Sequence, residues 1–131
     1  MKIATYLNFD GNCAEAFRFY AETLGGTIAF MQRFGESPMA DQVPPEKRDQ
    51  VMHATLNVGD QTLLGCDSFY PYETPRTFAV CVTLPVAEAE RVWGALSQGA
   101  KVEMPLEETF WAKRFGALRD RFGIPWMING E

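Results

Sequence analysis

AEAFRFYAETLGG (residues 14–26) and AEAERVWGALSQG (residues 87–99) are two copies of one segment, 73 residues apart. At this offset Ala14-Glu15-Ala16 matches Ala87-Glu88-Ala89, Arg18 matches Arg91, and Gly26 matches Gly99. Each copy follows a short apolar run, has the apolar spacing of a helix and leads through glycine into another apolar run. A period longer than half the chain is too long for a solenoid repeat. It predicts two copies of one β-α-β module, and paired modules tend to enclose one shared cavity.

The composition predicts a globular domain and argues against two classes of partner. The chain has 131 residues, of which 47% are hydrophobic, enough to bury a core. A net charge of −5 without a basic patch argues against nucleic acid binding. Apolar stretches such as residues 78–84 are far too short to span a bilayer, so no membrane association is expected. The three cysteines, without an export signal, are expected to be reduced thiols in a cytoplasmic protein.

Local patterns predict the order β-α-β-β-β in each half of the chain. In the first half, we expect strands at residues 2–8, 27–34, 51–58 and 61–66, and a helix over residues 13–24 that Asp10 or Asn12 can cap. In the second half, we expect strands at residues 77–84, 101–106, 113–119 and 124–129, and a helix over residues 86–98. Residues 35–49 form a long polar loop, expected to be a lid or a mobile flap. The fold class is α+β, a single domain over residues 1–131 with module one at about 1–70 and module two at about 75–131.

Several short motifs have the same places in this order as in one known superfamily. They are Asn12 to Phe19, Val51-Met52-His53-Ala54, Asp67, Phe110-Trp111, Arg114-Phe115-Gly116, Asp120-Arg121-Phe122-Gly123 and Trp126. The chain resembles the vicinal oxygen chelate superfamily, which includes glyoxalase I, the extradiol dioxygenases and the bleomycin and fosfomycin resistance proteins. Within it, the chain is most similar to the PhnB-like branch. The resemblance implies curved sheets around a cup, helices outside and a homodimer that completes or covers the cups.

The resemblance also implies where a metal ion would bind, with one ligand from the first and one from the last strand of each module. Those four positions fall on Thr5, on residues 64–66, on Phe78 and on Met127. Phenylalanine cannot bind a metal, methionine and cysteine favour soft metals, and the chain has a single histidine. We therefore expect that the inherited metal centre is absent, that no cofactor is bound and that these positions line an apolar cavity. A carboxylate site for Mg or Mn elsewhere is the alternative.

Three residues near the end of module one are candidates for chemistry. Histidine is the residue type best suited to acid–base chemistry near neutral pH, so if His53 faces the cup it can act as a catalytic general base or bond a ligand oxygen. The alternative is a histidine held in the sheet by hydrogen bonds. Cys66 lies at an inherited ligand position and is expected to line the pocket, as a ligand contact or as packing. Asp67 either caps a turn or receives a polar group of the ligand.

Module two contributes an aromatic and cationic set. Trp111, Arg114 and Phe115 at the rim of a cup would suit a planar or anionic small molecule, by stacking and bidentate hydrogen bonding. Core or dimer packing is the alternative for these residues. The apolar lining of the cup is expected from Leu7, Phe78, Val80 and Met127, and the linker side chains Phe69, Tyr70 and Tyr72 can flank it.

These observations favour a small-molecule-binding protein with a mostly apolar cup and no metal site. The first alternative is a metal-dependent lyase, dioxygenase or thiol transferase of the same superfamily. The second is a drug-sequestering protein that binds without turnover. A methyltransferase is disfavoured, because no glycine-rich loop follows a first strand in a doubly wound pattern.

Overall fold

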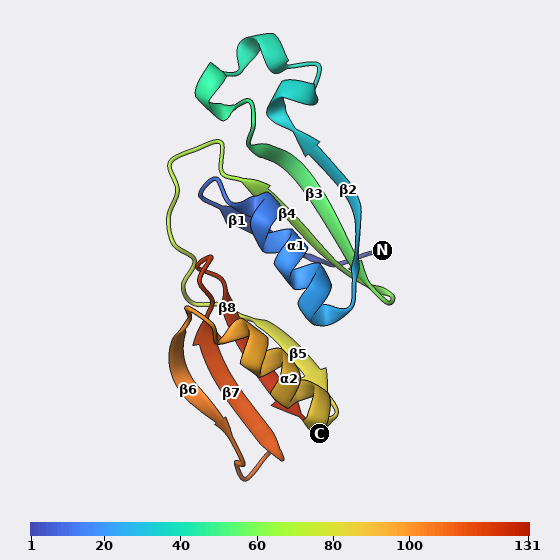
Figure 1. Ribbon diagram of the computed structural model, residues 1–131, viewed down its shortest axis with the longest axis vertical. Helices are drawn as coiled ribbons and strands as arrows, with labels where there is room; N and C mark the ends of the chain where they lie inside the picture. Colours follow the sequence, from blue (N-terminus) through green and yellow to red (C-terminus); the bar gives the residue numbers. More distant parts are fainter. The chain divides into compact units, whose positions relative to one another are not determined.

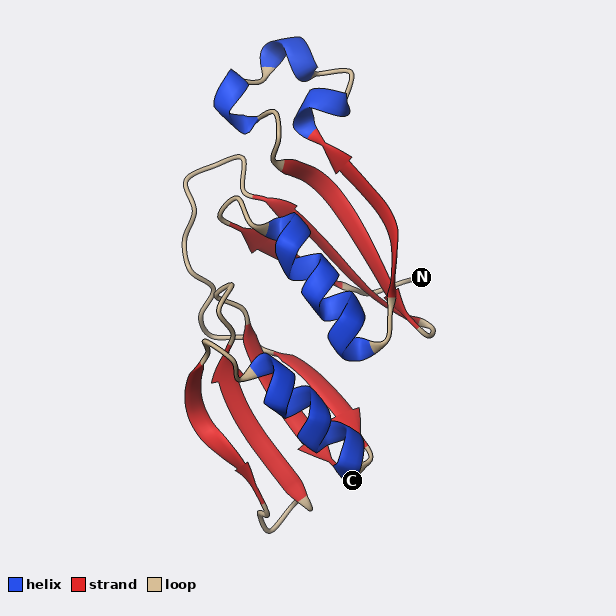
Figure 2. Cartoon of the chain, viewed as in Figure 1, coloured by secondary structure: helices blue, strands red, loops and turns tan.

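Two compact units make up the chain in the computed structural model, which describes all of residues 1–131. Unit 1 is Met1–Tyr72 and unit 2 is Glu73–Glu131. In each unit, one α-helix lies across one face of a four-stranded sheet (Figures 1 and 2). No helix in the chain is long and apolar enough to cross a membrane.

Unit 1 has the order β-α-β-β-β. Its elements are β1 (Thr5–Phe9), α1 (Cys13–Leu24), β2 (Thr27–Arg33), β3 (Val51–Val58) and β4 (Gln61–Asp67), with three short 3₁₀ helices between β2 and β3, η1 (Phe34–Glu36), η2 (Ala40–Gln42) and η3 (Pro45–Lys47). The sheet order is β1-β4-β3-β2. β1 runs parallel to β4, and the other neighbours are antiparallel. The helix therefore serves as the crossover that lets the first and last strands pair in parallel.

Unit 2 repeats this arrangement. Its elements are β5 (Val80–Leu84), α2 (Val86–Leu96), β6 (Lys101–Glu107), β7 (Arg114–Arg119) and β8 (Pro125–Gly130). The sheet order is β5-β8-β7-β6, which places the first, last, third and second strands as in unit 1. β5 and β8 are again the parallel pair. The prediction of an α+β fold with two βαβββ modules is confirmed.

An aromatic side chain of each helix packs on a glycine of the sheet below it. In unit 1, a Cβ at Gly65 would come within 2.7 Å of the Phe17 ring. In unit 2, a Cβ at Gly116 would come within 2.7 Å of the Trp93 ring. Both glycines are needed because a side chain there would occupy the volume of the helix aromatic. The two units therefore use the same kind of contact at different places in the repeat, since Gly65 lies in the last strand of unit 1 and Gly116 in the third strand of unit 2.

Those glycines identify the face of each sheet that meets its helix. Leu7 of β1 and Ala54 of β3 are register partners of Gly65, so all three point toward α1. Ile128 of β8 is the register partner of Gly116 and points toward α2. Because side chains alternate along a strand, the residues on either side of these point to the opposite face. We call the two opposite faces the helix-free face of unit 1 and the helix-free face of unit 2.

Two expected strands are shorter in the structure. β1 begins at Thr5, three residues after the expected start, and residues 1–4 are exposed. β5 begins at Val80, so Phe78 precedes the strand. Val80 already pairs with Trp126, the second residue of β8, and a longer β5 would have almost no partner strand. The polar loop at residues 35–49 contains local structure, and Val43 within it is buried.

The start of α1 also differs from the expectation. Asn12 is the N-cap residue, but its side chain makes no capping hydrogen bond. The Cys13 backbone N–H instead donates to Asp67 Oδ1 at 2.9 Å. The capping group therefore comes from the end of β4, 54 residues away in the sequence.

Candidate functional site

The middle of the helix-free face of unit 1 combines polar, uncharged side chains with apolar ones and carries no carboxylate, ammonium or guanidinium. It is formed by Tyr6 and Asn8 of β1, Phe30 and Gln32 of β2, His53 and Thr55 of β3, and Leu64 and Cys66 of β4. Tyr6 and Phe30 are 42% and 48% exposed, so apolar ring surface is available to a ligand. This face is the candidate functional site.

His53 lies among two rings and two hydroxyl groups. The Tyr6 hydroxyl oxygen is 3.0 Å from His53 Nδ1, and Thr55 Oγ1 is 3.5 Å from Nε2. The ring centroids of Tyr6 and Phe30 lie 5.7 and 5.9 Å from that of the imidazole. Nδ1 therefore has a well-placed partner, whereas the Nε2 contact is long and weak. A ligand can displace the Thr55 hydroxyl from Nε2 at little cost.

Cys66 lies on the same face as His53. Its Sγ donates to Asn8 Oδ1 at 3.3 Å. Burial raises the pKa of the Cys66 thiol; its hydrogen bond with Tyr6 opposes the rise, and the Asp67 carboxylate adds to it. Burial, reinforced by Cys66, also raises the pKa of the Tyr6 phenol. Both groups therefore keep their protons at neutral pH, and Cys66 is a hydrogen-bond donor here instead of a thiolate nucleophile.

Asp67 has a structural role in place of the ligand contact considered from the sequence. Only 1% of it is exposed. Its Oδ1 accepts from the Cys13 backbone N–H at 2.9 Å, and its Oδ2 accepts from the Val51 backbone N–H at 2.8 Å. The carboxylate thus joins the start of α1 to the start of β3 and is closed to a ligand.

The expectation that Leu7 and Val80 line a cup is corrected by the strand register. Leu7 is 1% exposed and points toward α1 with its partner Gly65. Val80 is the partner of the buried Trp126, on the α2 side of its sheet. Both side chains lie in the layer between helix and sheet. Along each strand the residues facing the helix are one position away from those expected, and a shift of one residue exchanges the two faces.

The expected set at the rim of module two is divided between the two faces. Arg114 pairs in register with Gly130 on the α2 side, and its Nε lies 3.4 Å from Glu90 Oε1 of that helix. Trp111 contacts the Phe115 ring at 5.4 Å, on the other face. The structure therefore brings the two aromatic residues together without the arginine. Exposed apolar side chains nearby are Met127, Met104 and Trp111, and Phe78 is exposed ahead of β5.

The donor atoms at the four inherited ligand positions do not fit a divalent metal ion. They belong to Thr5, to residues 64–66, to Phe78 and to Met127, among which only a hydroxyl, a protonated thiol and a thioether are side-chain donors. Elsewhere in the chain no group of three or more His, Cys, Asp or Glu side chains could hold a metal ion. The residues present thus do not form the metal centre that the fold implies.

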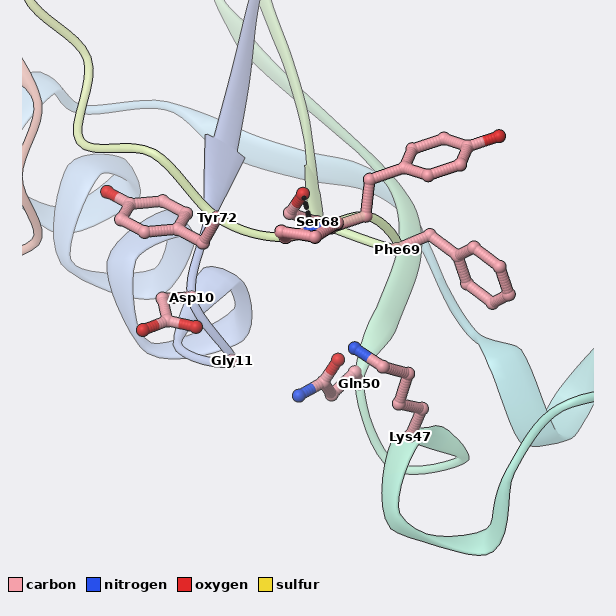
Figure 3. Close-up of a pocket in the computed structure, with 9 residues that line it drawn as sticks. Asp10, Gly11, Lys47, Gln50, Ser68, Phe69 and Tyr72 are labelled. Carbon is pink, nitrogen blue, oxygen red and sulfur yellow. Dashed lines mark hydrogen bonds between the residues drawn. The ribbon is translucent and has the colours of Figure 1, made fainter.

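A separate pocket of about 380 Å³ opens at the carboxyl ends of β1 and β4 in unit 1. Its lining residues are Asp10, Gly11, Lys47, Gln50, Ser68, Phe69, Tyr70, Pro71 and Tyr72. Figure 3 shows Asp10 and Lys47 on either side of Gln50, with the segment that carries Ser68 and Phe69 across from them. The linker aromatics that were expected to flank a cavity lie here.

Sequence reasoning missed most of the residues that surround His53. Tyr6, Asn8 and Thr55 were not selected, although each alternates with a residue that meets α1. The signal that could have found them is the alternation of side chains along each strand. Because Leu7 points toward α1, its neighbours Tyr6 and Asn8 must point to the opposite face, which also carries Cys66 and His53. In the pocket, Asp10 and Lys47 were missed because they line the same pocket only once β1 and η3 are placed in space.

The two βαβββ modules, each with a four-stranded mixed sheet, define a glyoxalase-like fold. A glyoxalase-related enzyme from Fulvimarina pelagi shares this fold, with a TM-score of 0.62 at 15% identity over 100% of this chain and 88% of that one. The sequence model of the family described as 3-demethylubiquinone-9 3-methyltransferase matches residues 1–129. The chain belongs to that family.

Individual relatives agree with this assignment. Protein YjdN of Escherichia coli K12 is 32% identical, over 98% of this chain and 95% of its own length. The crystal structure of protein PA1353 from Pseudomonas aeruginosa matches with a TM-score of 0.92 and 45% identity, over 100% of this chain and 98% of that one. A PhnB protein from Bacillus cereus, described as a putative 3-demethylubiquinone-9 3-methyltransferase, matches with a TM-score of 0.85 and 29% identity over the whole of both chains. The resemblance to the PhnB-like branch is confirmed.

Proposed function

We propose that this protein binds an uncharged, planar small molecule against the helix-free face of unit 1, with His53 as the polar anchor. The observation that carries the proposal is the environment of His53. A titratable imidazole lies between two exposed aromatic rings, and its Nε2 has only a long contact to Thr55. Exposed rings with one convergent polar group are typical of a small-molecule site.

The charge of the ligand follows from the groups around His53. Tyr6, Asn8, Phe30, Thr55 and Cys66 offer ring faces, hydroxyls, an amide and a protonated thiol. A buried ionic group on the ligand would find no charged partner here other than the imidazole of His53 itself, and burying an unpaired charge is strongly unfavourable. Flat apolar surface can instead stack on the Tyr6 and Phe30 rings. At this position His53 can also take a proton from the bound molecule, which is the first requirement for a general base.

The proposed site works without a divalent metal ion, since the donors at the inherited positions do not suit one. We expect protein purified without a chelator to contain no stoichiometric Zn, Ni, Mn or Fe by elemental analysis. Adding each ion should leave the thermal midpoint unchanged, because only a ligand that prefers the native state raises its stability. One tightly bound ion per chain would contradict the proposal and favour a metal-dependent enzyme of the same fold.

The family description names a methyltransferase, and the proposal does not include that activity. The sheets in units 1 and 2 are mixed, with one parallel pair each, so neither is a doubly wound sheet of parallel strands. A fold hosts many chemistries, and function follows from the site. The groups around His53 support binding of an uncharged molecule.

His53→Gln should weaken binding of an uncharged aromatic compound by about tenfold, since the glutamine loses both the ring stacking and the imidazole hydrogen bond. Compounds would be selected by thermal stabilisation of the wild-type protein and measured by calorimetry. Lys47→Gln, in the pocket of Figure 3, serves as the matched control and should bind normally. If Lys47→Gln lost affinity while His53→Gln kept it, the binding site would be the pocket that Lys47 lines and the proposed site would be wrong.

A further inference from the structure

The pocket at the carboxyl ends of β1 and β4 lies outside the proposed site around His53. Its volume of about 380 Å³ is within the range of small-molecule sites, and every residue that lines it belongs to unit 1. None of the side chains around His53 on the helix-free face of unit 1 is part of its lining. A ligand of this pocket would therefore be selected by different side chains.

One wall of the pocket is the turn formed by η3 and the residues that follow it. The Gln50 backbone N–H donates to the Lys47 carbonyl oxygen at 3.1 Å. Side chains at positions i and i+3 of such a turn emerge on the same side, so Lys47 and Gln50 both line the pocket. Figure 3 shows the Lys47 side chain extending toward Gln50. This turn therefore brings one positive charge to the pocket.

The opposite wall is the turn between β1 and α1, which contains Asp10 and Gly11. Gly11 has a φ of +87°, and a Cβ there would lie 3.3 Å from Gln50 Nε2. Glycine thus lets the turn lie directly against the Gln50 amide, with Asp10 and Lys47 on either side of it (Figure 3). No ion pair joins Asp10 or Lys47 to another side chain. Two opposite charges, neither of them paired, therefore flank one amide.

The third wall is the aromatic segment at residues 69–72, Phe-Tyr-Pro-Tyr. Ser68 Oγ donates to the Tyr70 carbonyl oxygen at 2.8 Å, which fixes the start of the segment. The Phe69 ring packs on the buried Phe34 at 5.5 Å between centroids, yet 44% of Phe69 remains exposed. Aromatic surface beside charged groups suits a ligand that has an apolar ring as well as charges.

The amide between the two charges has a hydrogen-bonding group that the protein does not satisfy. Gln50 Oε1 is buried and has no hydrogen-bond partner. Buried polar groups of side chains are nearly always paired, so an unpaired one beside a pocket calls for an explanation. A rotation of the amide toward the pocket would let a polar ligand group pair with it. An amide has both donors and an acceptor, so this pairing does not depend on which way it is turned.

We propose that this pocket binds a small zwitterion, an α-amino acid with an aromatic side chain. Its ammonium group pairs with Asp10, its carboxylate pairs with Lys47 and its ring lies against residues 69–72. A ligand with only a positive charge would be repelled by Lys47, and a ligand with only a negative charge would be repelled by Asp10. The proposal does not rest on the proposed function, because the two sites share no residue.

Three compounds with the same phenyl ring and a similar chain separate the two charges. L-Phenylalanine has both an ammonium group and a carboxylate, 2-phenylethylamine has only the first and 3-phenylpropionate only the second. By calorimetry at pH 7 and low salt, the wild-type protein should bind phenylalanine about fivefold more tightly than either of the others. Equal affinities for all three compounds would overturn the proposal, and so would the absence of binding by any of them.

Variants of the two charged residues test which group pairs with which. Lys47→Gln should reduce the affinity for phenylalanine to that for 2-phenylethylamine, because the carboxylate loses its partner. Asp10→Asn should reduce it to the affinity for 3-phenylpropionate for the corresponding reason. Lys2→Gln and Asp60→Asn remove the same charges at exposed positions outside the pocket and should keep the wild-type ratios. Wild-type ratios in Lys47→Gln and Asp10→Asn would overturn the proposal.

The place of binding can be measured separately from the affinities. In ¹H–¹⁵N spectra, phenylalanine should shift the backbone amide signals of Gly11, Gln50 and Ser68 and leave those of Tyr6 and His53 unchanged. Shifts at Tyr6 and His53 without shifts at the pocket would place phenylalanine on the helix-free face of unit 1 and overturn the proposal.

Discussion

Asp120→Ala is expected to lower the free energy of unfolding by at least about 3 kcal/mol, because it orphans three hydrogen-bond donors in unit 2. Asp120 is 4% exposed. Its Oδ1 accepts from the backbone N–H groups of Phe122 at 2.9 Å and Ile124 at 3.0 Å, and its Oδ2 accepts from the Trp126 indole at 2.8 Å. Each buried donor left without an acceptor costs about 1–3 kcal/mol.

Denaturant unfolding followed by tryptophan fluorescence measures this effect, since Trp126 is itself one of the donors. Asp120→Asn keeps one side-chain carbonyl oxygen and should lose less stability than Asp120→Ala. Asp60→Ala, in the exposed turn between β3 and β4, is the surface control and should change stability by less than about 0.5 kcal/mol. If Asp120→Ala were as stable as Asp60→Ala, the assigned role of Asp120 would be wrong.

Asp67→Ala should cost unit 1 at least about 2 kcal/mol for the same physical reason, with two buried backbone donors in place of three. The donors are the N–H groups of Cys13 and Val51, so α1 loses its cap and β3 loses the bond at its start. The fall in thermal midpoint and in the denaturant midpoint measures the loss. Asp67→Asn should lie between the wild-type protein and Asp67→Ala, because its amide nitrogen would face one of the two N–H donors.

The effect on ligand binding separates the structural role of Asp67 from the ligand contact that the sequence allowed. In folded Asp67→Asn protein, affinity for an uncharged aromatic compound should stay within about twofold of the wild-type value, since the carboxylate is buried away from the helix-free face. If folded Asp67→Ala protein had lost its affinity for the compound, Asp67 would be a ligand contact and its purely structural role would be wrong.

The fold could be predicted from the sequence because its signals are local and repeated. The Ala-Glu-Ala segments, the glycines after each helix and the apolar runs between them each report on a few neighbouring residues. Two copies of that pattern fix the order of the elements, and the sheets follow from it. The strand ends could not be predicted as well, since β5 begins as late as Val80 because its parallel partner β8 starts only at Pro125.

The site could be predicted only in part, because it depends on the phase of each strand. Shifting a strand by one residue exchanges its two faces. The sequence pattern therefore places Leu7 in the cup, whereas in the structure its neighbours Tyr6 and Asn8 lie on the helix-free face of unit 1. Arg114 lies toward α2 for the same reason, where Glu90 pairs with it. Asp67 could not be assigned from local sequence, since its partner Cys13 is 54 residues away.

A crystal structure of the protein soaked with 2-naphthol tests the proposed ligand site most directly. We expect density for the ring system on the helix-free face of unit 1, against Tyr6 and Phe30, with the hydroxyl oxygen within hydrogen-bonding distance of His53 Nε2. Density confined to the pocket between Asp10 and Lys47, with the surroundings of His53 empty, would contradict it.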